Sequence, residues 1–303
     1  MSPDPAPVTV QIQTVLFRNS NADVWRLLFG VAGTVALARK EGLLTEARWV
    51  LGDCSPTAVL PPEEVALLEA TATREGIDAF SCEFFDANLG SSGGHNRLAT
   101  NGWGDVLVTL NPDTYPSPRM LPELLDALRQ DKVGIAEARQ LPMEHPKRYS
   151  LTTGETSWAS TCAIAVPRTL FDALDGFDHD HFPLYCDDVD FSWRARYAGH
   201  KVVVAPRATV FHDKRPSSGG VQISSDVEVF HSTLGRLMLA TRYARSDIRD
   251  QTIRWVDTNG SDPQREALAE FRSRESTGRV PTPLKDAGRV AQFVDGEYAE
   301  HRF

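Results

Sequence analysis

The first half of the chain alternates between two hydrophobic patterns, and this alternation constrains the fold more than any other feature. Residues 8–17, VTVQIQTVLF, alternate with a period of two, which is typical of a strand. Residues 22–39 then place apolar side chains at three- and four-residue spacing, which predicts a helix with one apolar face. Further strands are predicted at 47–53, 77–85 and 105–110, with helices from 61 and from 120. Such alternation predicts an α/β fold with a mainly parallel central sheet and right-handed crossovers.

Polar residues follow three of the predicted strands. Arg18 and Asn19 follow the first, Asp53 and Ser55 the second, and Asp113 the fourth. Each alone is also explained as a loop start or helix cap. In parallel sheets, however, ligands collect at the carboxyl ends of the strands. The three sites together therefore favour a binding site at this edge.

A glycine-rich segment, NLGSSGGHNR, occupies residues 88–97 after the third strand. Its glycines permit close backbone approach, and it leads into a predicted helix whose free N–H groups favour anions. The spacing and position differ from those of the dinucleotide-binding fingerprint. Both an anion-binding loop and a flexible connector fit this segment.

Three aspartates crowd into CDDVD, residues 186–190. A helix beginning near Asp187 is predicted by the four-residue recurrence of Val189, Trp193 and Tyr197, and Asp190 and Arg194 can then pair one turn apart. A carboxylate at a helix start is stabilised by backbone N–H groups, so capping explains one acid. Three are more than a cap needs, and neighbouring carboxylates raise each other's pKa, as a general base requires. The cluster favours catalysis.

The second half has a less regular pattern. A strand interrupted by a loop bearing Trp158 is predicted within 155–168, and two short strands at 201–206 and 208–212. The Ser- and Gly-rich segment 213–225 predicts a mobile loop that either closes over a diphosphate or merely connects. A helix is predicted at 226–246, followed by a polar, linker-like region around a short helix.

Six motifs in order carry a resemblance. They are Asp53-x-Ser55, NLGSSGGHN, LNPDT, SWAS, GFDHDHFPLYCDDVDFSWRARYAG and VFH. Over residues 8–215 the chain resembles the family 2 glycosyltransferases, in particular their bacterial rhamnosyltransferase-like branch. The resemblance implies a GT-A fold over 1–215, with a nucleotide-sugar half at about 1–114 and an acceptor half at about 115–215. Residues 216–303 would then form the mobile loop and a helical C-terminal extension.

The resemblance also implies an activity and a metal. The family transfers a sugar, here with rhamnose favoured, from a nucleoside diphosphate sugar to a hydroxyl with inversion, usually with Mg²⁺ or Mn²⁺. Asp113 matches the last acid of the family's DxD motif, and Asn111 replaces the first acid. His212 matches the family's distal histidine, which reaches the metal or the diphosphate.

The same resemblance assigns the remaining roles. Asp188 matches the family's catalytic base, and Asp187 replaces its usual glutamate on the acceptor side. Trp158 matches a residue that lines the acceptor or sugar pocket, with a buried core tryptophan as the alternative. Asp53 matches the acid that recognises the nucleobase or ribose, beside Phe17 and Asn19. The other residues expected on the donor side are Ser55, Gly90, Gly93, Asn96, Asn111, Arg194, Lys214 and Arg215.

Composition narrows the partners and the compartment. A net charge of −9 argues against nucleic acid, which is bound by clustered positive charge. No apolar run approaches the roughly 20 residues of a membrane-spanning helix, and the start, MSPDPAPVTV, lacks the pattern of a secretory signal. Four cysteines without metal-type spacing predict reduced thiols. We therefore expect a cytoplasmic protein with at most peripheral contact at the inner face of the membrane. The resemblance implies that its acceptor is a glycan or a lipid-linked intermediate of bacterial cell-envelope polysaccharide assembly.

Three alternatives stay open. The acids and His212 also suit a metal-dependent hydrolase with a two-metal cluster. A catalytically silent protein that only binds nucleotide sugars fits the same motifs. The apolar stripe of the helix after 226 either packs within one subunit or pairs two subunits in a homodimer. The stripe consists of Val227, Phe230, Leu234 and Leu237.

Overall fold

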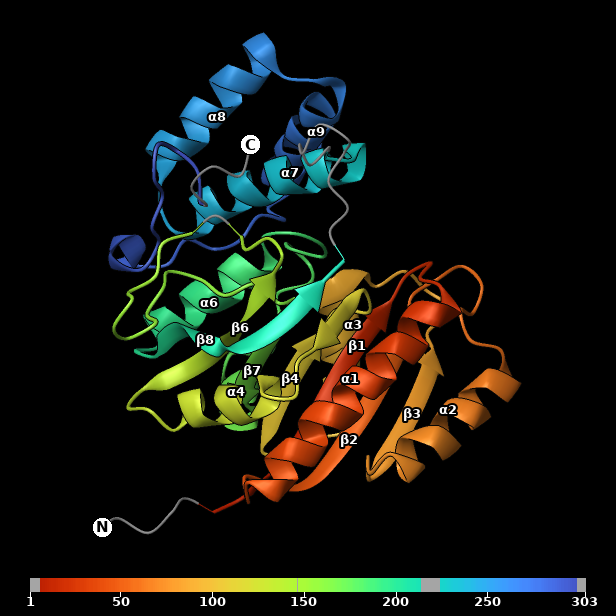
Figure 1. Ribbon diagram of the computed structural model, residues 1–303. Coiled ribbons are helices and arrows are strands. Elements are labelled where there is room, and N and C mark those ends of the chain that lie inside the picture. Colours follow the sequence, from red (N-terminus) through yellow and green to blue (C-terminus); the bar gives the residue numbers. More distant parts are fainter. Residues whose placement is uncertain (1–5, 146, 214–223, 299–303) are drawn as a thin grey trace.

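The computed structural model describes residues 6–145, 147–213 and 224–298. One sheet runs through the described residues in the strand order β3-β2-β1-β4-β7-β6-β8-β5 (Figure 1). The strands are β1 (Val8–Leu16), β2 (Leu44–Asp53), β3 (Ala79–Phe84), β4 (Val106–Leu110), β5 (Thr114–Pro116), β6 (Val133–Leu141), β7 (Ala163–Pro167) and β8 (Lys201–His212). The helices are α1 (Asn21–Lys40), α2 (Pro62–Arg74), α3 (Gly90–Ala99), α4 (Met120–Leu128), α5 (Arg168–Ala173), α6 (Asp187–Tyr197), α7 (Asp226–Arg242), α8 (Ser246–Asn259) and α9 (Asp262–Ser276), with a 3₁₀ turn η1 (Ala287–Arg289).

The sheet is mainly parallel, as the sequence predicts. β1 pairs in parallel with β2 and β4, β2 with β3, and β6 with β8. β7 runs antiparallel between β4 and β6, and β5 runs antiparallel at the edge beside β8. The strands β1, β2, β3, β4, β6 and β8 therefore share one direction, and their carboxyl ends meet at one edge.

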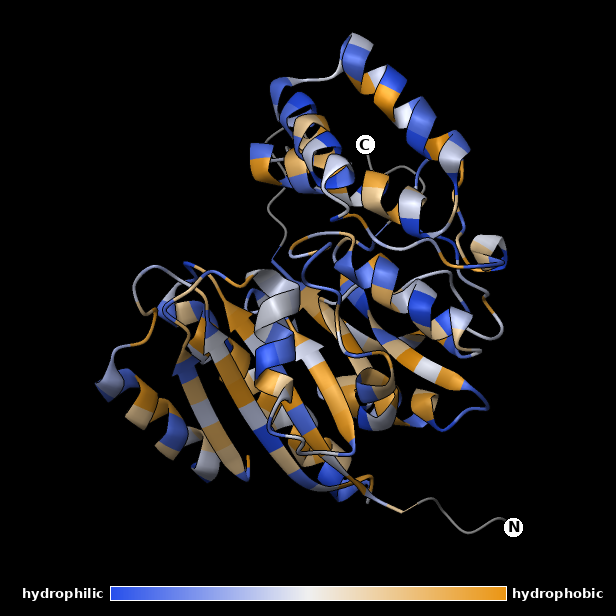
Figure 2. Ribbon diagram, turned by 180° about the vertical axis from the view of Figure 1, so that it is seen from behind, coloured by the Kyte–Doolittle hydropathy of each residue, from blue (hydrophilic) through white to orange (hydrophobic). Residues whose placement is uncertain are grey.

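Helices cover both faces of the sheet. α1, α2 and α4 lie on one face, and α3 and α6 on the other (Figure 1). The strands between them are largely hydrophobic (Figure 2). On the first face Ile12 and Val108 pack against Leu28 and Val31 of α1 in the largest core cluster. On the second face Phe191 of α6 joins a separate cluster. Both faces of the sheet are covered, so the polar residues Gln11, Gln13 and Thr14 of the central strand β1 are buried as well as its apolar ones.

The C-terminal helices α7, α8 and α9 lie over the carboxyl edge of the sheet (Figure 1). They share a core with the sheet domain: Trp158 and Trp193 pack in one cluster with Leu237 of α7 and Phe271 of α9. The helix predicted at 226–246 is present and ends at Arg242. The C-terminal helices therefore pack against α6 and share one hydrophobic core with it.

The apolar stripe of α7 is mostly used within one subunit. Leu234 and Leu237 are buried, and Phe230 packs partly against the same cluster. Val227, at the start of the helix, is exposed. Packing within the subunit, one of the two alternatives that the sequence left open, accounts for most of the stripe.

The structure corrects the sequence prediction in the second half. The segments 201–206 and 208–212 form one strand, β8, whose register with β6 shifts after Ala205, where Pro206 interrupts the ladder. The polar, linker-like region contains two long helices, α8 and α9, instead of one short helix. No disulfide joins the four cysteines, all of which lie within the described residues. Within the described residues, no helix has the length and apolarity to cross a membrane.

Candidate active site at the carboxyl edge of the sheet

Asp113 and His212 meet at the carboxyl edge. β5 and β8 pair with Thr114 opposite His212, so the residue before β5 and the last residue of β8 lie side by side. Asp113 Oδ2 is 3.1 Å from His212 Nε2. The imidazole is nearly buried, with 9% of its side chain exposed, whereas 41% of the Asp113 side chain is exposed. Two residues separated by 99 positions thus form a polar pair that is open on the carboxylate side.

The other ring nitrogen of His212 points into the protein. Nδ1 is 2.9 Å from Gln140 Oε1 and 3.4 Å from Cys162 Sγ. The donor and acceptor roles depend on the tautomer of the ring. An amide oxygen can only accept, so a hydrogen on Nδ1 would bond Gln140 and leave the lone pair of Nε2 towards Asp113. With the hydrogen on Nδ1, Nε2 and the carboxylate are both acceptors, and a metal ion or a second imidazole proton between them would join the two groups.

This donor set fits a divalent metal. Carboxylate oxygen and imidazole nitrogen both coordinate Mn²⁺-type ions, and a metal-bound histidine usually donates its other N–H to a second group. Among the described residues, no group of three or more His, Cys, Asp or Glu side chains converges. Two protein ligands would leave the remaining positions to phosphate and water, as is usual for Mg²⁺ sites that serve nucleotides.

Asn111 lies in the turn between β4 and β5. Its backbone N–H donates to the carbonyl of Cys162 at 2.9 Å, and its own carbonyl accepts from the Thr114 hydroxyl at 2.6 Å. The half-buried Asn111 therefore shapes the turn that presents Asp113. The predicted donor contact of its side chain stays a prediction.

The acid cluster begins helix α6, as the sequence predicts. Two consecutive residues with positive φ, Tyr185 and Cys186, turn the chain into the helix. Asp187 is buried and Asp188 is half-buried, with Asp188 Oδ1 accepting the Val189 N–H at 2.8 Å. A short turn, 198–200, joins α6 to β8 in the opposite direction. The start of α6 therefore lies towards the same carboxyl edge as His212.

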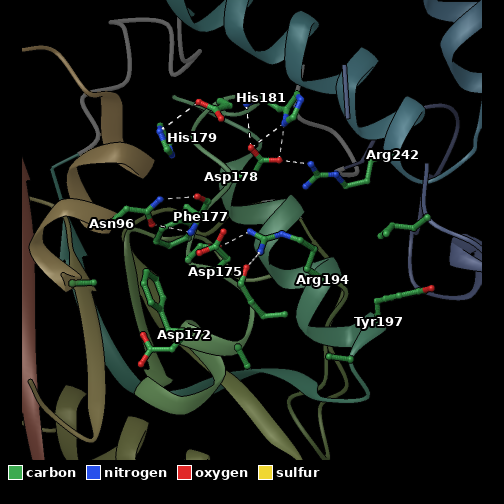
Figure 3. A pocket seen from close by; sticks show the side chains of 18 of the residues that line it. Asn96, Asp172, Asp175, Phe177, Asp178, His179, His181, Arg194, Tyr197 and Arg242 are labelled. Atoms are coloured by element: carbon green, nitrogen blue, oxygen red, sulfur yellow. Dashed lines mark hydrogen bonds and ion pairs between the residues drawn. The ribbon is translucent and has the colours of Figure 1, made fainter. Parts of the chain in front are cut away.

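Asp190 and Arg194 pair as predicted, with 2.7 Å between Asp190 Oδ2 and Arg194 Nε. The two terminal nitrogens of Arg194 donate to the carbonyls of Leu174 and Gly176, at 2.6 and 2.8 Å (Figure 3). Each nitrogen of this guanidinium is thus already engaged. Arg194 therefore ties α6 to the 174–176 turn, and its predicted diphosphate contact stays a prediction.

A second arginine, Arg242 of α7, completes this network. It bonds Asp190 Oδ1 at 2.7 Å and also contacts Asp178, which in turn bonds His181 (Figure 3). Burial alone would raise the pKa of Asp178, but the hydrogen bond from His181 and the charge of Arg242 outweigh it and lower that pKa. Sequence reasoning missed Arg242, because an isolated arginine in a helix carries no motif.

A cavity of about 880 Å³ adjoins the network (Figure 3). Its lining comes from the 171–181 segment, from α3 and α6, and from Thr282 and Leu284 of the extension. Asp178 and Arg242 border it but already bond to each other. The cavity thus lies at the junction of the sheet domain and the extension.

The residues predicted on the donor side fall into two groups in the structure: some bond the backbone of nearby loops, and others remain accessible. Asp53 is buried, and its two oxygens accept the N–H groups of Ser55 and Val59, at 2.9 and 2.6 Å. Ser55 Oγ accepts the N–H of Arg18 at 2.8 Å. Asp53 and Ser55 therefore build the loop beyond β2, where the resemblance implies a nucleobase or ribose contact.

Phe17 remains accessible beside this loop. It is 46% exposed, and its N–H donates to Asn19 Oδ1 at 2.9 Å. The Arg18 guanidinium lies 5.2 Å from the Phe17 ring centroid, and Arg18 has a positive φ of 57°. An exposed aromatic ring at the end of the first strand suits stacking against a planar base.

The glycine-rich segment forms the start of α3. A Cβ on Gly90 would lie 2.2 Å from the Pro183 carbonyl, and that carbonyl also accepts the N–H of Ser92 at 3.4 Å. Gly93 lies buried in the first turn. Asn96 bonds the backbone of Phe177 in both directions, at 2.7 and 2.8 Å. The segment thus packs against the 177–183 loop, and the close approach that the glycines permit is to protein backbone.

Trp158 is buried, the alternative that the sequence left open. Its ring lies 4.3 Å from Lys147 Nζ, and Lys147 also bonds the Trp158 carbonyl at 3.1 Å. Lys147 forms an ion pair with Glu137 of β6, and both side chains are almost fully buried. Burial raises the pKa of Glu137 despite the nearby Lys147 charge. Lys214 and Arg215 lie outside the described residues.

No protein-family model and no curated protein sequence matches this chain. Solved structures do. A mannosyltransferase from Pyrobaculum calidifontis, in complex with GDP-Man and Mn²⁺, superposes with a TM-score of 0.58 at 14% identity, over 90% of this chain and 76% of that one. GalNAc-T7 with UDP, GalNAc and Mn²⁺ gives 0.62 at 14% identity, over 92% and 56%. Residues 1–349 of S. aureus TarS give 0.54 at 13% identity, over 90% and 81%.

The chain has the GT-A fold. At these identities the likeness extends to the fold and no further. Within it, Asp113 and His212 occupy the carboxyl edge at which α/β sheets bind ligands. The C-terminal helices α7–α9 of this GT-A chain border the same edge (Figure 1).

Proposed function

We propose that this protein is a metal-dependent glycosyltransferase that uses a nucleoside diphosphate sugar as donor. The observation that carries the proposal is the contact of Asp113 with His212 at the carboxyl edge of a GT-A fold. The imidazole is fixed from behind by Gln140, and the carboxylate faces outward. A single carboxylate–imidazole pair suits a cation that receives its other ligands from a diphosphate.

Asp113 and His212 would hold Mg²⁺ or Mn²⁺. The metal, when bound, would neutralise the charge that develops on the departing diphosphate. Asp188, at the start of α6, would accept the proton of the acceptor hydroxyl while its oxygen attacks the anomeric carbon. The bond to the diphosphate breaks on the opposite side, so the configuration inverts.

The acids of α6 divide their tasks in this proposal. Asp190 is consumed by Arg194 and Arg242 and is fully buried, so it holds the helix. Asp188 is partly accessible. Phe17 would stack on the nucleobase, and Asp187 would border the acceptor. The arrangement does not favour the hydrolase alternative, because Asp190 is committed to two arginines.

We propose rhamnose as the transferred sugar, because the six motifs occur along the chain in the order typical of the rhamnosyltransferase-like branch. A glycan or lipid-linked intermediate of bacterial cell-envelope assembly would be the acceptor. The reaction would take place in the cytoplasm, at the inner face of the membrane.

A panel of nucleotide sugars tests the proposal. Thermal unfolding is measured with UDP-, GDP- and deoxythymidine-diphosphate sugars, each with and without Mn²⁺ or Mg²⁺. We expect one nucleotide to raise the unfolding temperature, and only when metal is present, because the diphosphate completes the coordination. The absence of any metal-dependent shift across the panel would reject the proposal.

A further inference from the structure

Gln140 has an environment that the activity proposed above does not explain. It lies in β6, a strand between β7 and β8, and its side chain is buried. Its Oε1 lies 2.9 Å from His212 Nδ1. No acceptor lies within hydrogen-bond distance of its Nε2 among the residues that the structure describes. A buried amide that leaves half of its capacity unused is costly, so its one bond needs a reason.

The tautomer of His212 supplies that reason. A neutral imidazole carries one hydrogen, on either nitrogen, and only the other nitrogen can bind a metal. Nε2 faces Asp113, and Nδ1 faces the interior. A metal beside Asp113 therefore requires the hydrogen on Nδ1, where it needs an acceptor.

We propose that Gln140 is a positioning residue for the metal ligand His212. Gln140 Oε1 accepts the hydrogen of Nδ1 and so directs the Nε2 lone pair to the metal beside Asp113. This inference rests on the proposed function, because it assigns a role towards the same metal. Cys162 Sγ, 3.4 Å from Nδ1, is a second and weaker acceptor.

The chain contains its own matched control. Gln13 of β1 is a buried glutamine whose Oε1 lies 3.2 Å from Nδ1 of another buried histidine, His95. Its Nε2 also lacks an acceptor among the described residues. The Gln13–His95 pair and the Gln140–His212 pair have the same chemistry. They differ in that His212, the histidine of the second pair, also contacts Asp113.

The test compares the wild type with Gln140→Leu, Gln140→Glu and Gln13→Leu. Free Mn²⁺ is measured by electron paramagnetic resonance, in the presence of whichever of UDP, GDP and deoxythymidine diphosphate binds the wild type. We expect Gln140→Leu to weaken Mn²⁺ binding by about 10- to 100-fold, as is usual when such a partner is lost. Gln140→Glu, which keeps an acceptor, should bind at least as tightly as the wild type. Gln13→Leu should bind like the wild type.

A second readout needs no metal. ¹⁵N resonances of His212, recorded in the pH range in which they no longer change with rising pH, report which nitrogen carries the hydrogen. We expect Nδ1–H in the wild type and in Gln140→Glu, and loss of that preference in Gln140→Leu. Circular dichroism checks that each variant folds, and Gln140→Met, which keeps the side-chain length, replaces the leucine variant if it does not.

The outcomes separate the two proposals. Equal Mn²⁺ affinity in the wild type and Gln140→Leu, or Nε2–H in the wild type, overturns the role of Gln140. A wild type that binds no Mn²⁺ with any of the three nucleotides overturns the proposed metal site, while the resonances of His212 still decide the tautomer. Loss of binding in Gln13→Leu to the same degree would reduce the effect to general destabilisation and also overturn the role.

Discussion

At the scale of single residues, most polar side chains of the family-like motifs are used to build the site rather than to line it. Asp53 accepts two N–H groups of its own loop, and Asn96 bonds the backbone of Phe177. Arg194 donates hydrogen bonds to Asp190 and to two backbone carbonyls. Sequence could predict that these residues gather near the site. The sequence could not distinguish structural residues from substrate-binding residues, because an aspartate that caps a loop and an aspartate that binds a substrate are the same residue type.

A substitution of Asp188 should affect the rate of sugar transfer but not the affinity for the nucleotide. Replacing it with Asn removes a proton acceptor but keeps the size of the side chain. We expect transfer to fall by about 10²- to 10⁴-fold, the usual contribution of a general base, with little change in nucleotide affinity. Rates come from product formation, and affinity from calorimetry with the nucleoside diphosphate. Turnover at the wild-type rate would remove Asp188 from the mechanism.

His95 should make the free energy of unfolding depend on pH. Its burial lowers the pKa from 6.5 to about 4 in the folded state. Between these values the unfolded chain binds more protons, so stability falls as pH decreases from about 6.5 to about 4, by up to ~3 kcal/mol. Urea unfolding at several pH values measures the slope, and His95→Gln should flatten it. A variant with the same slope as the wild type would contradict this assignment.

At the scale of elements, the first half of the sheet follows the sequence closely and the second half does not. β1 and α1 differ from their predicted limits by a residue at one or both ends, since their apolar periods are clear. Residues 133–141 carry no predicted strand, because Glu137 and Arg139 interrupt the apolar run of β6; the buried Glu137 is stabilised by Lys147 and by a backbone hydrogen bond at Ser160. α8 buries a narrow stripe of Ile248, Thr252 and Val256, so its sequence looks like a linker.

We expect the ion pairs of Arg242, which join α7 to α6, to contribute strongly to the free energy of unfolding. Arg242→Met leaves the buried Asp190 and the half-buried Asp178 with one partner fewer each, and the loss of a partner from a buried charge costs about 3–5 kcal/mol. Arg245→Met is the matched control, because Arg245 pairs with the exposed Asp247, and surface ion pairs contribute little to stability. Urea unfolding measures both free energies. Equal costs for the two variants would show that the buried network is not what joins the helices.

At the scale of the whole molecule, the sheet domain and the C-terminal helices share one core. Trp193 of α6 packs edge-on against Tyr243, just after α7, at 4.9 Å between ring centroids. Trp158 and Phe271 lie in the same cluster. The expected division at about residue 215 therefore does not coincide with a division of the hydrophobic core. A sequence shows amphipathic helices but not which surface covers them, so this shared core could not be foreseen.

Unfolding should therefore be a single transition. Leu237, fully buried in α7, should lower the stability of the whole protein by about 2–5 kcal/mol when replaced by Ala. Urea curves followed by tryptophan fluorescence and by far-ultraviolet circular dichroism should shift together. Loss of helical signal well before the fluorescence change would mean that the extension unfolds by itself.

The central claim is that Asp113 and His212 bind a divalent metal that is completed by a nucleoside diphosphate. Calorimetric titration of the cognate nucleoside diphosphate, with and without Mn²⁺, tests it most directly when wild type and Asp113→Ala are compared. The account predicts that Mn²⁺ tightens binding to the wild type and has no such effect on Asp113→Ala, whose nucleotide affinity equals that of the metal-free wild type. An identical metal dependence in both proteins would place the metal elsewhere and contradict the account.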